Sequence, residues 1–400
     1  VWKFNPGSAA RQEWFGCSCC PTNIVRFIPS LAGYVYARRD ADVYVNLFVG
    51  GEGRLTVGDT ALTLKQETGY PWQGDVRITV QPDQPARFTL CVRIPGWAQG
   101  RPVPSDLYRY VDLAAGQPPV ELRVNGTAVQ LDVQQGYARL DRQWQPGDVV
   151  TLTLPMPIRR VLPHPEIAAT RGSVALERGP LVYCIEGVDH GGQVCDLILA
   201  DDAPLTTEQR PDLFGGVTVL RGKALRLQAP GDPTRDLAPR LVATDFLAIP
   251  NYAWAHRGIS PMTVWLPRTP AGARVPSLAT DATATASHTG ERTTPDALRD
   301  DVPVVSSGDP AAPRFTWYDH RGTTEWVQYD FPTARRVSAV EVYWFDEGPD
   351  GQCRVPTSWR LLYKAGDAWQ PVSATAPFGT ALDGYNVVPF APVETPALRL

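Results

Sequence analysis

The sequence predicts a mainly β protein built from tandem β-sandwich or jelly-roll domains. After Arg39, short runs rich in Val, Ile, Leu, Thr and aromatic residues alternate with Gly, Pro and Asp, a pattern typical of antiparallel sandwiches. The 400 residues include 39 prolines, about twice the average usage, which favours turns and short strands over helices. A chain of this length can hold several domains, each with its own core.

Two β-sandwich domains are expected over residues 40–157 and 158–267. The boundary lies near Ile158, where the strand ending in TLTLPMPI gives way to the Pro-rich RRVLPHPE. Asn125-Gly126 and Pro146-Gly147-Asp148 have the composition of hairpin turns. The clearest predicted strands are Val43–Val49, Arg54–Val57, Asp75–Val80, Arg87–Ile94, Val120–Val124, Val149–Leu154 and Ser173–Ile185. RIPGW (93–97) and RGPLVY (178–183) are predicted to be buried strands.

A third β module is expected over residues 276–400, after a linker at 268–275. TEWVQYDFPTARRVSAVEVYWFD (324–346) and VPTSWRLLYKAGDAWQPV (355–372) resemble strands of the galactose-binding-like, discoidin-type β-sandwich. The final PALRL resembles the start of a last strand, so we expect this module to be truncated.

Before Arg39, the stretch EWFGCSCCPTNIVRF (13–27) holds three cysteines. Cys17, Cys19 and Cys20 directly precede a predicted helix that Thr22 or Asn23 can cap. Its apolar residues recur at helical spacing and are Ile24, Phe27, Ile28, Leu31 and Val35. Because a thiol at the positive end of a helix has a lowered pKa, these cysteines are candidate nucleophiles or metal ligands.

Spacing alone leaves several roles open for this cysteine cluster. Cys17 and Cys20 form a C-x-x-C pair, as in a redox couple or half a zinc knuckle. A redox couple would need a thioredoxin-like βαβ surrounding, whereas only strands are predicted downstream. A second half-knuckle is missing, because the remaining cysteines are isolated: Cys91, Cys184, Cys195 and Cys353. Metal or nucleophile chemistry and an inert buried cluster are about equally supported at this point.

The segment WFGCSCCPTNIVRFIPSLAGYVYA resembles the cysteine signature of the β-L-arabinofuranosidases of glycoside hydrolase family 127 and its relatives. The resemblance covers residues 1 to about 268. Further matching segments follow in the family's order: YVNLFVG (44–50), YPWQGDVRITV (70–80), FTLCVRIPGWA (88–98), GYARLDRQWQPGDVVTLTLPMPIRRV (136–161), VALERGPLVYCIEGVD (174–189) and IPNYAWAHRGISPMTVWLP (249–267).

The resemblance implies a role for each of two cysteines. In the family, the first cysteine of the C-C-P triplet is the nucleophile and its neighbour is a zinc ligand, which maps onto Cys19 and Cys20. Both would bind zinc, the expected cofactor, and no role maps onto Cys17. The family's (α/α)6 barrel supplies the acid/base glutamate and the other zinc ligands well before this triplet. Because only eighteen residues precede Cys19, residues 1–39 are expected to be the last loop and helix of that barrel.

The implied function is that of a retaining glycoside hydrolase acting on β-L-arabinofuranosides through a zinc-bound cysteine thiolate. This chain would be its C-terminal portion and inactive alone. The expected partner is an arabinose-containing oligosaccharide or glycoconjugate. The alternative is a non-catalytic carbohydrate-binding or structural chain of β-sandwiches, which the missing barrel favours for this piece by itself.

Charge and hydropathy bear on partners and location. The net charge of −4 is spread without blocks, so no nucleic acid or anionic membrane is expected to bind. No apolar run approaches the ~20 residues of a membrane span. The seven cysteines are odd in number and mostly isolated, which favours a reducing compartment, and hence the cytoplasm over secretion.

Other chemistry-bearing residues are predicted to be structural. Glu177 and Glu186 lie on one predicted strand, too far apart for a glycosidase carboxylate pair at roughly 5–9.5 Å, and are interpreted as sheet-face charges. The five histidines show no ligand-type pairing in sequence and are His164, His190, His256, His288 and His320.

Two further groups have an alternative role in binding. Trp317, Tyr318 and His320 lie in a loop-like segment and can stack on a sugar. Tyr252 and Arg257 are candidates to face the barrel of the longer enzyme.

Overall fold

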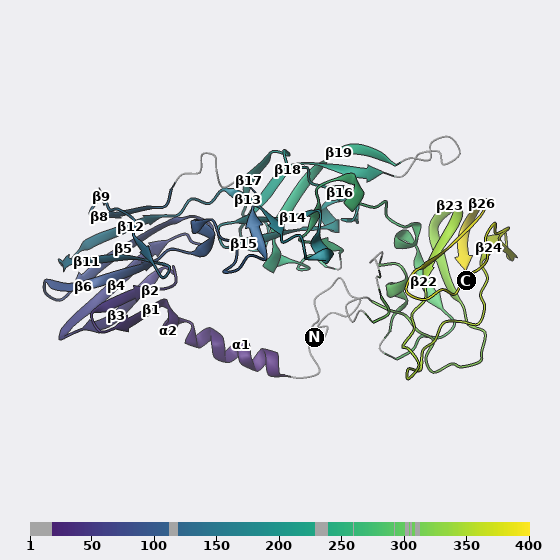
Figure 1. Ribbon diagram of the computed structural model, residues 1–400, viewed down its shortest axis with the longest axis horizontal. Coiled ribbons are helices and arrows are strands. Elements are labelled where there is room, and N and C mark those ends of the chain that lie inside the picture. Colours follow the sequence, from purple (N-terminus) through teal and green to yellow (C-terminus); the bar gives the residue numbers. More distant parts are fainter. Residues whose placement is uncertain are drawn as a thin grey trace. The chain divides into compact units, whose positions relative to one another are not determined.

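The computed structural model describes residues 18–111, 119–228, 239–258, 260–291, 293–300, 304, 306–308 and 313–400. Cys17 lies outside these described residues. The chain divides into two compact units on either side of the Arg274–Val275 bond. Strands dominate both units, which confirms the mainly β prediction (Figure 1).

Two sheets enclose the first core. One has the order β1 (Tyr36–Arg39), β2 (Asp42–Val45), β6 (Ala86–Arg93), β11 (Tyr137–Trp144), β10 (Val133–Gln134). The other has the order β3 (Gly51–Val57), β4 (Thr60–Thr68), β5 (Asp75–Pro82), β12 (Asp148–Thr153), β8 (Glu121–Val124), β9 (Thr127–Ala128). Alternate residues Val76, Ile78 and Val80 of β5 are buried, as period-two alternation requires, and share one core with Phe88 and Trp144 of the other sheet.

A larger sheet follows in the same unit, with ten strands among the described residues. Its main path is β16 (Leu197–Ile198), β18 (Val217–Gln228), β19 (Arg240–Pro250), β15 (Leu181–Glu186), β14 (Ser173–Arg178), β13 (Ile158–Pro163), β7 (Tyr108–Tyr110). Three short strands branch from it: β17 (Leu205–Arg210), β20 (Met262–Thr263) and β21 (Leu266–Pro267). β7 comes from the range predicted for the first sandwich, but it joins this sheet because Tyr110 pairs with Val161 of β13.

The predicted strand Ser173–Ile185 is instead a hairpin of β14 and β15. The turn is formed by Gly179 and Pro180, and Arg178 pairs with Leu181 across it. Gly179 has φ +57°, which glycine adopts without a Cβ penalty. Two short strands therefore replace one long strand.

The segments RIPGW and RGPLVY are only partly buried strands. Arg93 ends β6 and is exposed, while Ile94 and Trp97 are buried. Gly96–Gln99 forms a 3-10 helix rather than a strand. In RGPLVY, the hairpin turn exposes Pro180.

The C-terminal unit contains one antiparallel sheet. Its order is β22 (Thr283–Ala286), β23 (Val327–Tyr343), β26 (Tyr385–Arg399), β24 (Leu362–Ala365), β25 (Ala368–Pro371). The final PALRL, predicted to start a strand, lies at the end of β26, where Leu398 pairs with Tyr329. The galactose-binding-like interpretation of this unit stays a prediction.

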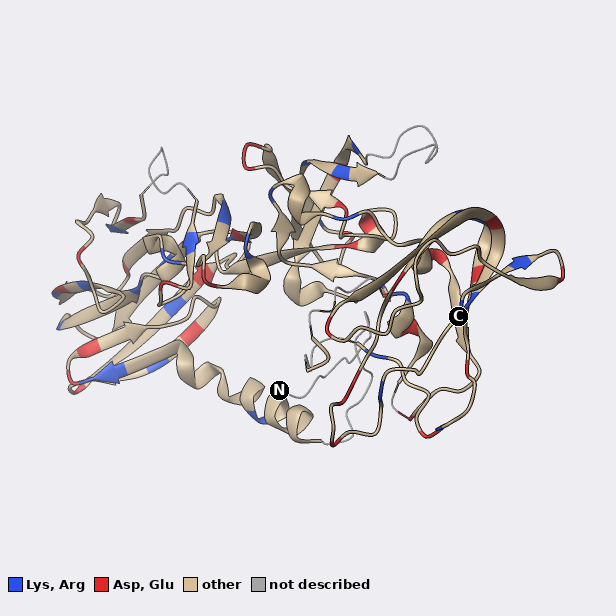
Figure 2. Ribbon diagram, turned by 45° about the vertical axis from the view of Figure 1, so that its right-hand side comes forward, with Lys and Arg blue, Asp and Glu red and all other residues tan. Residues whose placement is uncertain are grey.

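Among the described residues, α-helix is confined to residues 19–35. The two α-helices of that segment are α1 (Cys19–Ser30) and α2 (Ala32–Val35), and the other helices of the described chain are 3-10 helices of three or four residues. None of the helices in the described residues is long and apolar enough to cross a membrane. Acidic and basic residues are interspersed along the strands, whereas Arg26 is the only charged residue of α1 (Figure 2).

Candidate functional site

Cys19 and Cys20 are the first two residues of α1, and Ser18 is the N-cap. The predicted cap at Thr22 or Asn23 is therefore wrong. The Thr22 hydroxyl lies inside the first turn, 2.9 Å from the carbonyl oxygen of Ser18 and 3.1 Å from that of Cys19. The cysteines thus lie within the first turn, where the helix dipole has its positive end.

The two sulfur atoms are 3.9 Å apart. A disulfide bond is about 2.05 Å long, so the pair is not bonded. Two sulfurs at about 2.3 Å from one tetrahedral zinc ion would lie about 3.8 Å apart, which matches the observed separation. Among the described residues, no third His, Cys, Asp or Glu joins these thiols in a ligand group. The described residues therefore provide two ligand-type sulfurs at this place.

The apolar face of α1 is formed as the sequence predicted, but it is not packed within the described structure. Ile24 is 57 % exposed and Ile28 is 63 % exposed. Phe27 is also exposed, and no residue of α1 is buried. An apolar stripe of this kind normally lies against other elements of a folded core.

Arg257 lies within an ion-pair network of the 18–274 unit. Its Nη1 donates to Oδ1 of Asp189 at 2.8 Å, and its Nη2 donates to Oε2 of Glu186 at 2.7 Å. Glu186 is only 1 % exposed and also accepts from the Ala255 N–H at 2.8 Å. The guanidinium therefore neutralises interior carboxylates. Tyr252, the other candidate to face a barrel, is exposed and packs against Trp72.

Glu177 and Glu186 do not share one strand, contrary to the prediction, and Glu186 is buried rather than a charge on the sheet face. They lie on different strands of the hairpin, β14 and β15. Glu177 accepts a hydrogen bond from the Tyr110 hydroxyl at 2.7 Å, and burial raises the pKa of its carboxyl group. Since each carboxylate is engaged by another side chain, we assign neither to acid/base catalysis.

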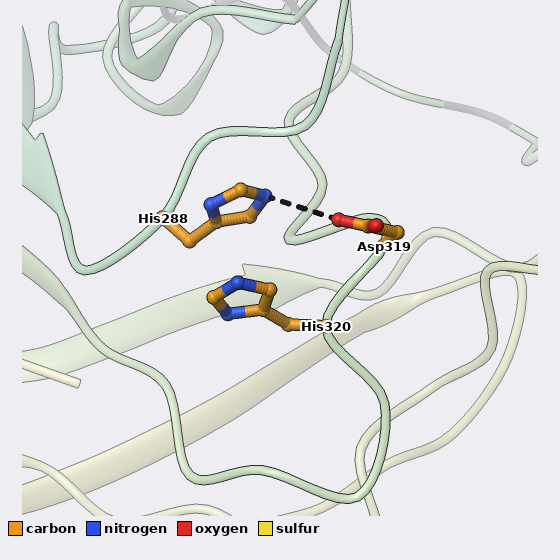
Figure 3. A group of neighbouring side chains, drawn as sticks. All are labelled: His288, Asp319 and His320. Atoms are coloured by element: carbon orange, nitrogen blue, oxygen red, sulfur yellow. Dashed lines mark ion pairs between the residues drawn. The ribbon is translucent and has the colours of Figure 1, made fainter.

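The C-terminal unit brings together two histidines that show no pairing in the sequence, with the Asp319 side chain beside them. His288, Asp319 and His320 form the only group of at least three metal-ligand side chains among the described residues (Figure 3). His288 and His320 come from separate segments, so sequence spacing gave no signal for them. The proposed sugar-stacking residues have unequal exposure. Trp317 is half-buried and packs edge-on against Phe315, whereas Tyr318 is exposed.

Two family models match the 18–274 unit. Residues 42–156 match "Beta-L-arabinofuranosidase, GH127 middle domain", and residues 158–267 match "Glycoside hydrolase family 127 C-terminal domain". The chain belongs to glycoside hydrolase family 127. The resemblance inferred from the cysteine signature and the ordered segments is thus confirmed, whereas neither match extends into the C-terminal unit.

Individual proteins that are similar to this chain indicate the same family. A curated non-reducing end β-L-arabinofuranosidase of Bifidobacterium longum subsp. longum is 33 % identical over 276 residues, covering 64 % of this chain and 38 % of that protein. A crystal structure of a family 127 β-L-arabinofuranosidase from Geobacillus stearothermophilus T6 is 38 % identical, with TM-score 0.57, covering 65 % of this chain and 39 % of that one. A family 127 β-arabinofuranosidase structure is 41 % identical, with TM-score 0.61, covering 66 % and 41 %. This chain therefore spans about two fifths of each relative.

Proposed function

We propose that this chain is the C-terminal part of a retaining glycoside hydrolase that cleaves β-L-arabinofuranosides, with Cys19 as its nucleophile. The observation that carries the proposal is the pair of thiols in the first turn of α1, with sulfurs 3.9 Å apart. The family supplies the substrate class, because the relatives are named for this activity. An arabinose-containing oligosaccharide or glycoconjugate is the proposed substrate.

Cys19 and Cys20 would hold a zinc ion together with ligands from beyond the described residues. The sulfur separation fits two thiolates on one tetrahedral ion. Zinc bound there would keep the sulfurs as thiolates at neutral pH. Because two of the four ligands lie in the described residues and the resemblance places the others in the barrel, we expect the 400-residue chain alone to hold zinc weakly.

The two cysteines would then have different tasks. Cys19 is exposed and Cys20 is partly buried, so Cys19 is the more accessible of the two and is the proposed nucleophile. Its thiolate would attack the anomeric carbon as the glycosidic C–O bond breaks, and an acid would protonate the leaving oxygen. Water would next cleave the C–S bond, giving a sugar with retained configuration and restoring the thiolate. Cys20 would anchor the metal throughout.

The exposed apolar face of α1 supports a longer enzyme. Ile24, Phe27 and Ile28 all lie on the surface of the described structure. Covering them with further helices would remove this apolar area from water, which is favourable at about 25 cal/mol per Å². The barrel that the resemblance implies would provide such helices, with residues 1–39 as its last loop and helix.

Turnover of an aryl β-L-arabinofuranoside tests this proposal. In the longer enzyme, Cys19→Ser should lower kcat by at least about 10³-fold, because serine is a poorer nucleophile and a poor zinc ligand. Cys20→Ser should act through metal loss and recover partly with added zinc. Cys17→Ser is the matched control and should have little effect.

The 400-residue chain alone should show no turnover, because general acid catalysis contributes about 10²–10⁴-fold and its glutamate is expected from the barrel. Full activity of Cys19→Ser in the longer enzyme would contradict the nucleophile assignment. It would favour the alternative of a non-catalytic chain of carbohydrate-binding or structural β modules.

A further inference from the structure

Three ligand-type side chains converge in the C-terminal unit, independently of the cysteine pair. His288 follows β22, while Asp319 and His320 lie in the segment before β23. One ligand atom from each residue lies within 4.8 Å of the others, and the two imidazole rings lie one above the other beside Asp319 (Figure 3). Imidazole nitrogen and carboxylate oxygen are donors that late first-row transition metals accept.

Glu325 fixes the orientation of His320. Its Oε1 atom is 2.7 Å from Nδ1 of His320, and the carboxylate also accepts hydrogen bonds from the hydroxyls of Ser287 and Thr323. Three donors thus converge on the carboxyl group of Glu325, and its two oxygens accept from all of them. A carboxylate only accepts, so Nδ1 of His320 carries the proton. In the neutral ring, Nε2 then keeps the lone pair that a metal needs.

His288 presents its Nε2 atom to two oxygens. Oδ1 of Asp319 is 3.8 Å away, and the carbonyl oxygen of Tyr318 is 3.0 Å away. In the metal-free form, Nε2–H donates to that carbonyl. When a metal ion binds, Nε2 would release this proton to water and Nδ1 would take one up, so that the neutral ring presents the Nε2 lone pair beside the Asp319 carboxylate.

The cluster is loose enough to close around an ion. The His288 and His320 rings are stacked with centroids 3.8 Å apart and an interplanar angle of 11°. Ligand atoms at about 2.0–2.1 Å from a tetrahedral ion lie about 3.4 Å apart. The ligand atoms here lie within 4.8 Å of one another, and Nε2 of His288 is 3.8 Å from Oδ1 of Asp319, so the separations must shorten by about 1.4 Å at most. Both rings are partly exposed and Asp319 is 77 % exposed, so side-chain rotation can provide this movement.

We propose that His288, Asp319 and His320 form a binding site for one divalent late first-row transition-metal ion, with zinc as its representative. Calcium and magnesium prefer sites made only of oxygen ligands, which this group is not. The ion would tie the end of β22 to the segment before β23. Metal binding would therefore stabilise the C-terminal unit. This role is separate from the proposed catalysis at Cys19.

Zinc titration of the metal-free 400-residue chain tests the site. The chain used carries Cys19→Ser and Cys20→Ser, which removes the other proposed zinc ligands. The result therefore does not depend on whether the proposed hydrolase function is correct. Calorimetry should show one zinc ion per chain. His288→Ala or His320→Ala should weaken binding by about 100-fold or more, and Glu325→Gln by about 10–100-fold, because it orients a ligand.

His164→Ala is the matched control, a histidine of the other unit, and should keep the affinity of the background chain. Asp319→Asn replaces a carboxylate ligand by a neutral amide, so it should weaken zinc binding. Because the side chain is exposed, the fold should be unaffected. Cobalt(II) should give visible absorption bands that disappear in the His288 and His320 variants. Equal zinc affinity in every variant, or no binding at millimolar zinc, would overturn the proposal.

Discussion

Replacing Arg257 by methionine should destabilise the 18–274 unit by about 3–5 kcal/mol. The guanidinium donates to Glu186 at 2.7 Å and to Asp189 at 2.8 Å. Glu186 is 1 % exposed, so water cannot replace the lost partner of its carboxylate. The cost therefore comes mainly from leaving a buried charge unpaired, and it exceeds that of a neutral hydrogen bond, which is about 1 kcal/mol.

A double-mutant cycle with Glu186→Gln isolates this effect. The amide is neutral and its oxygen can still accept from the Ala255 N–H, so Arg257→Met should cost only about 1–2 kcal/mol in that background. Denaturant unfolding measures the loss in free energy of unfolding caused by Arg257→Met in each of the two backgrounds. Hydrogen exchange of the β15 amides serves as a local probe. Arg54→Met is the control, because Arg54 has an 84 % exposed side chain, and it should change stability by less than about 0.5 kcal/mol. A cost below about 1 kcal/mol for Arg257→Met alone would refute the reasoning.

Two further predictions concern the same unit. Burial lowers the pKa of His190, whose neutral ring accepts from the Leu247 N–H at Nε2. The stability that the neutral ring contributes is present above about pH 6.5 and is lost as the pH falls below that value. In His190→Gln, the free energy of unfolding measured in urea should therefore depend less on pH between about pH 6.5 and 5. An unchanged slope would contradict this. Gly74→Ala should lower the free energy of unfolding by about 1–3 kcal/mol, because the added Cβ would lie 1.8 Å from the Leu154 carbonyl oxygen. Gly33→Ala is the control, because its Cβ would have no atom within 4 Å. Equal thermal midpoints for the two variants would contradict the clash.

The alternation of apolar residues predicted much of the fold. Val76, Ile78 and Val80 alternate with polar neighbours, and their strand lies where the pattern indicated. The hairpin at Gly179-Pro180 was missed because apolar residues on both sides suggested one continuous strand. The pairing of β7 with β13 was missed because it joins residues about fifty positions apart, and local pattern carries no information on such partners.

The candidate site was predictable only in part. The adjacent cysteines before an apolar helical stretch identified Cys19 and Cys20, but the start of the helix was misplaced because Ser18 caps it without a side-chain hydrogen bond. The pairing of Arg257 with Glu186 and the approach of His288 to His320 depend on chain folding over long separations. No short-range signal in the sequence distinguishes these residues from solvent-exposed charges or isolated histidines.

The central claim is that Cys19 becomes covalently attached to the sugar during turnover. The direct measurement is peptide mass spectrometry of the longer enzyme, acid-quenched while it turns over an aryl β-L-arabinofuranoside. Trypsin should release residues 12–26, and fragment ions can separate Cys17, Cys19 and Cys20 within that peptide. The account predicts one added pentosyl group on Cys19, absent in Cys19→Ser. A pentosyl group on a carboxylate or on Cys20, or a product of inverted configuration, would contradict it.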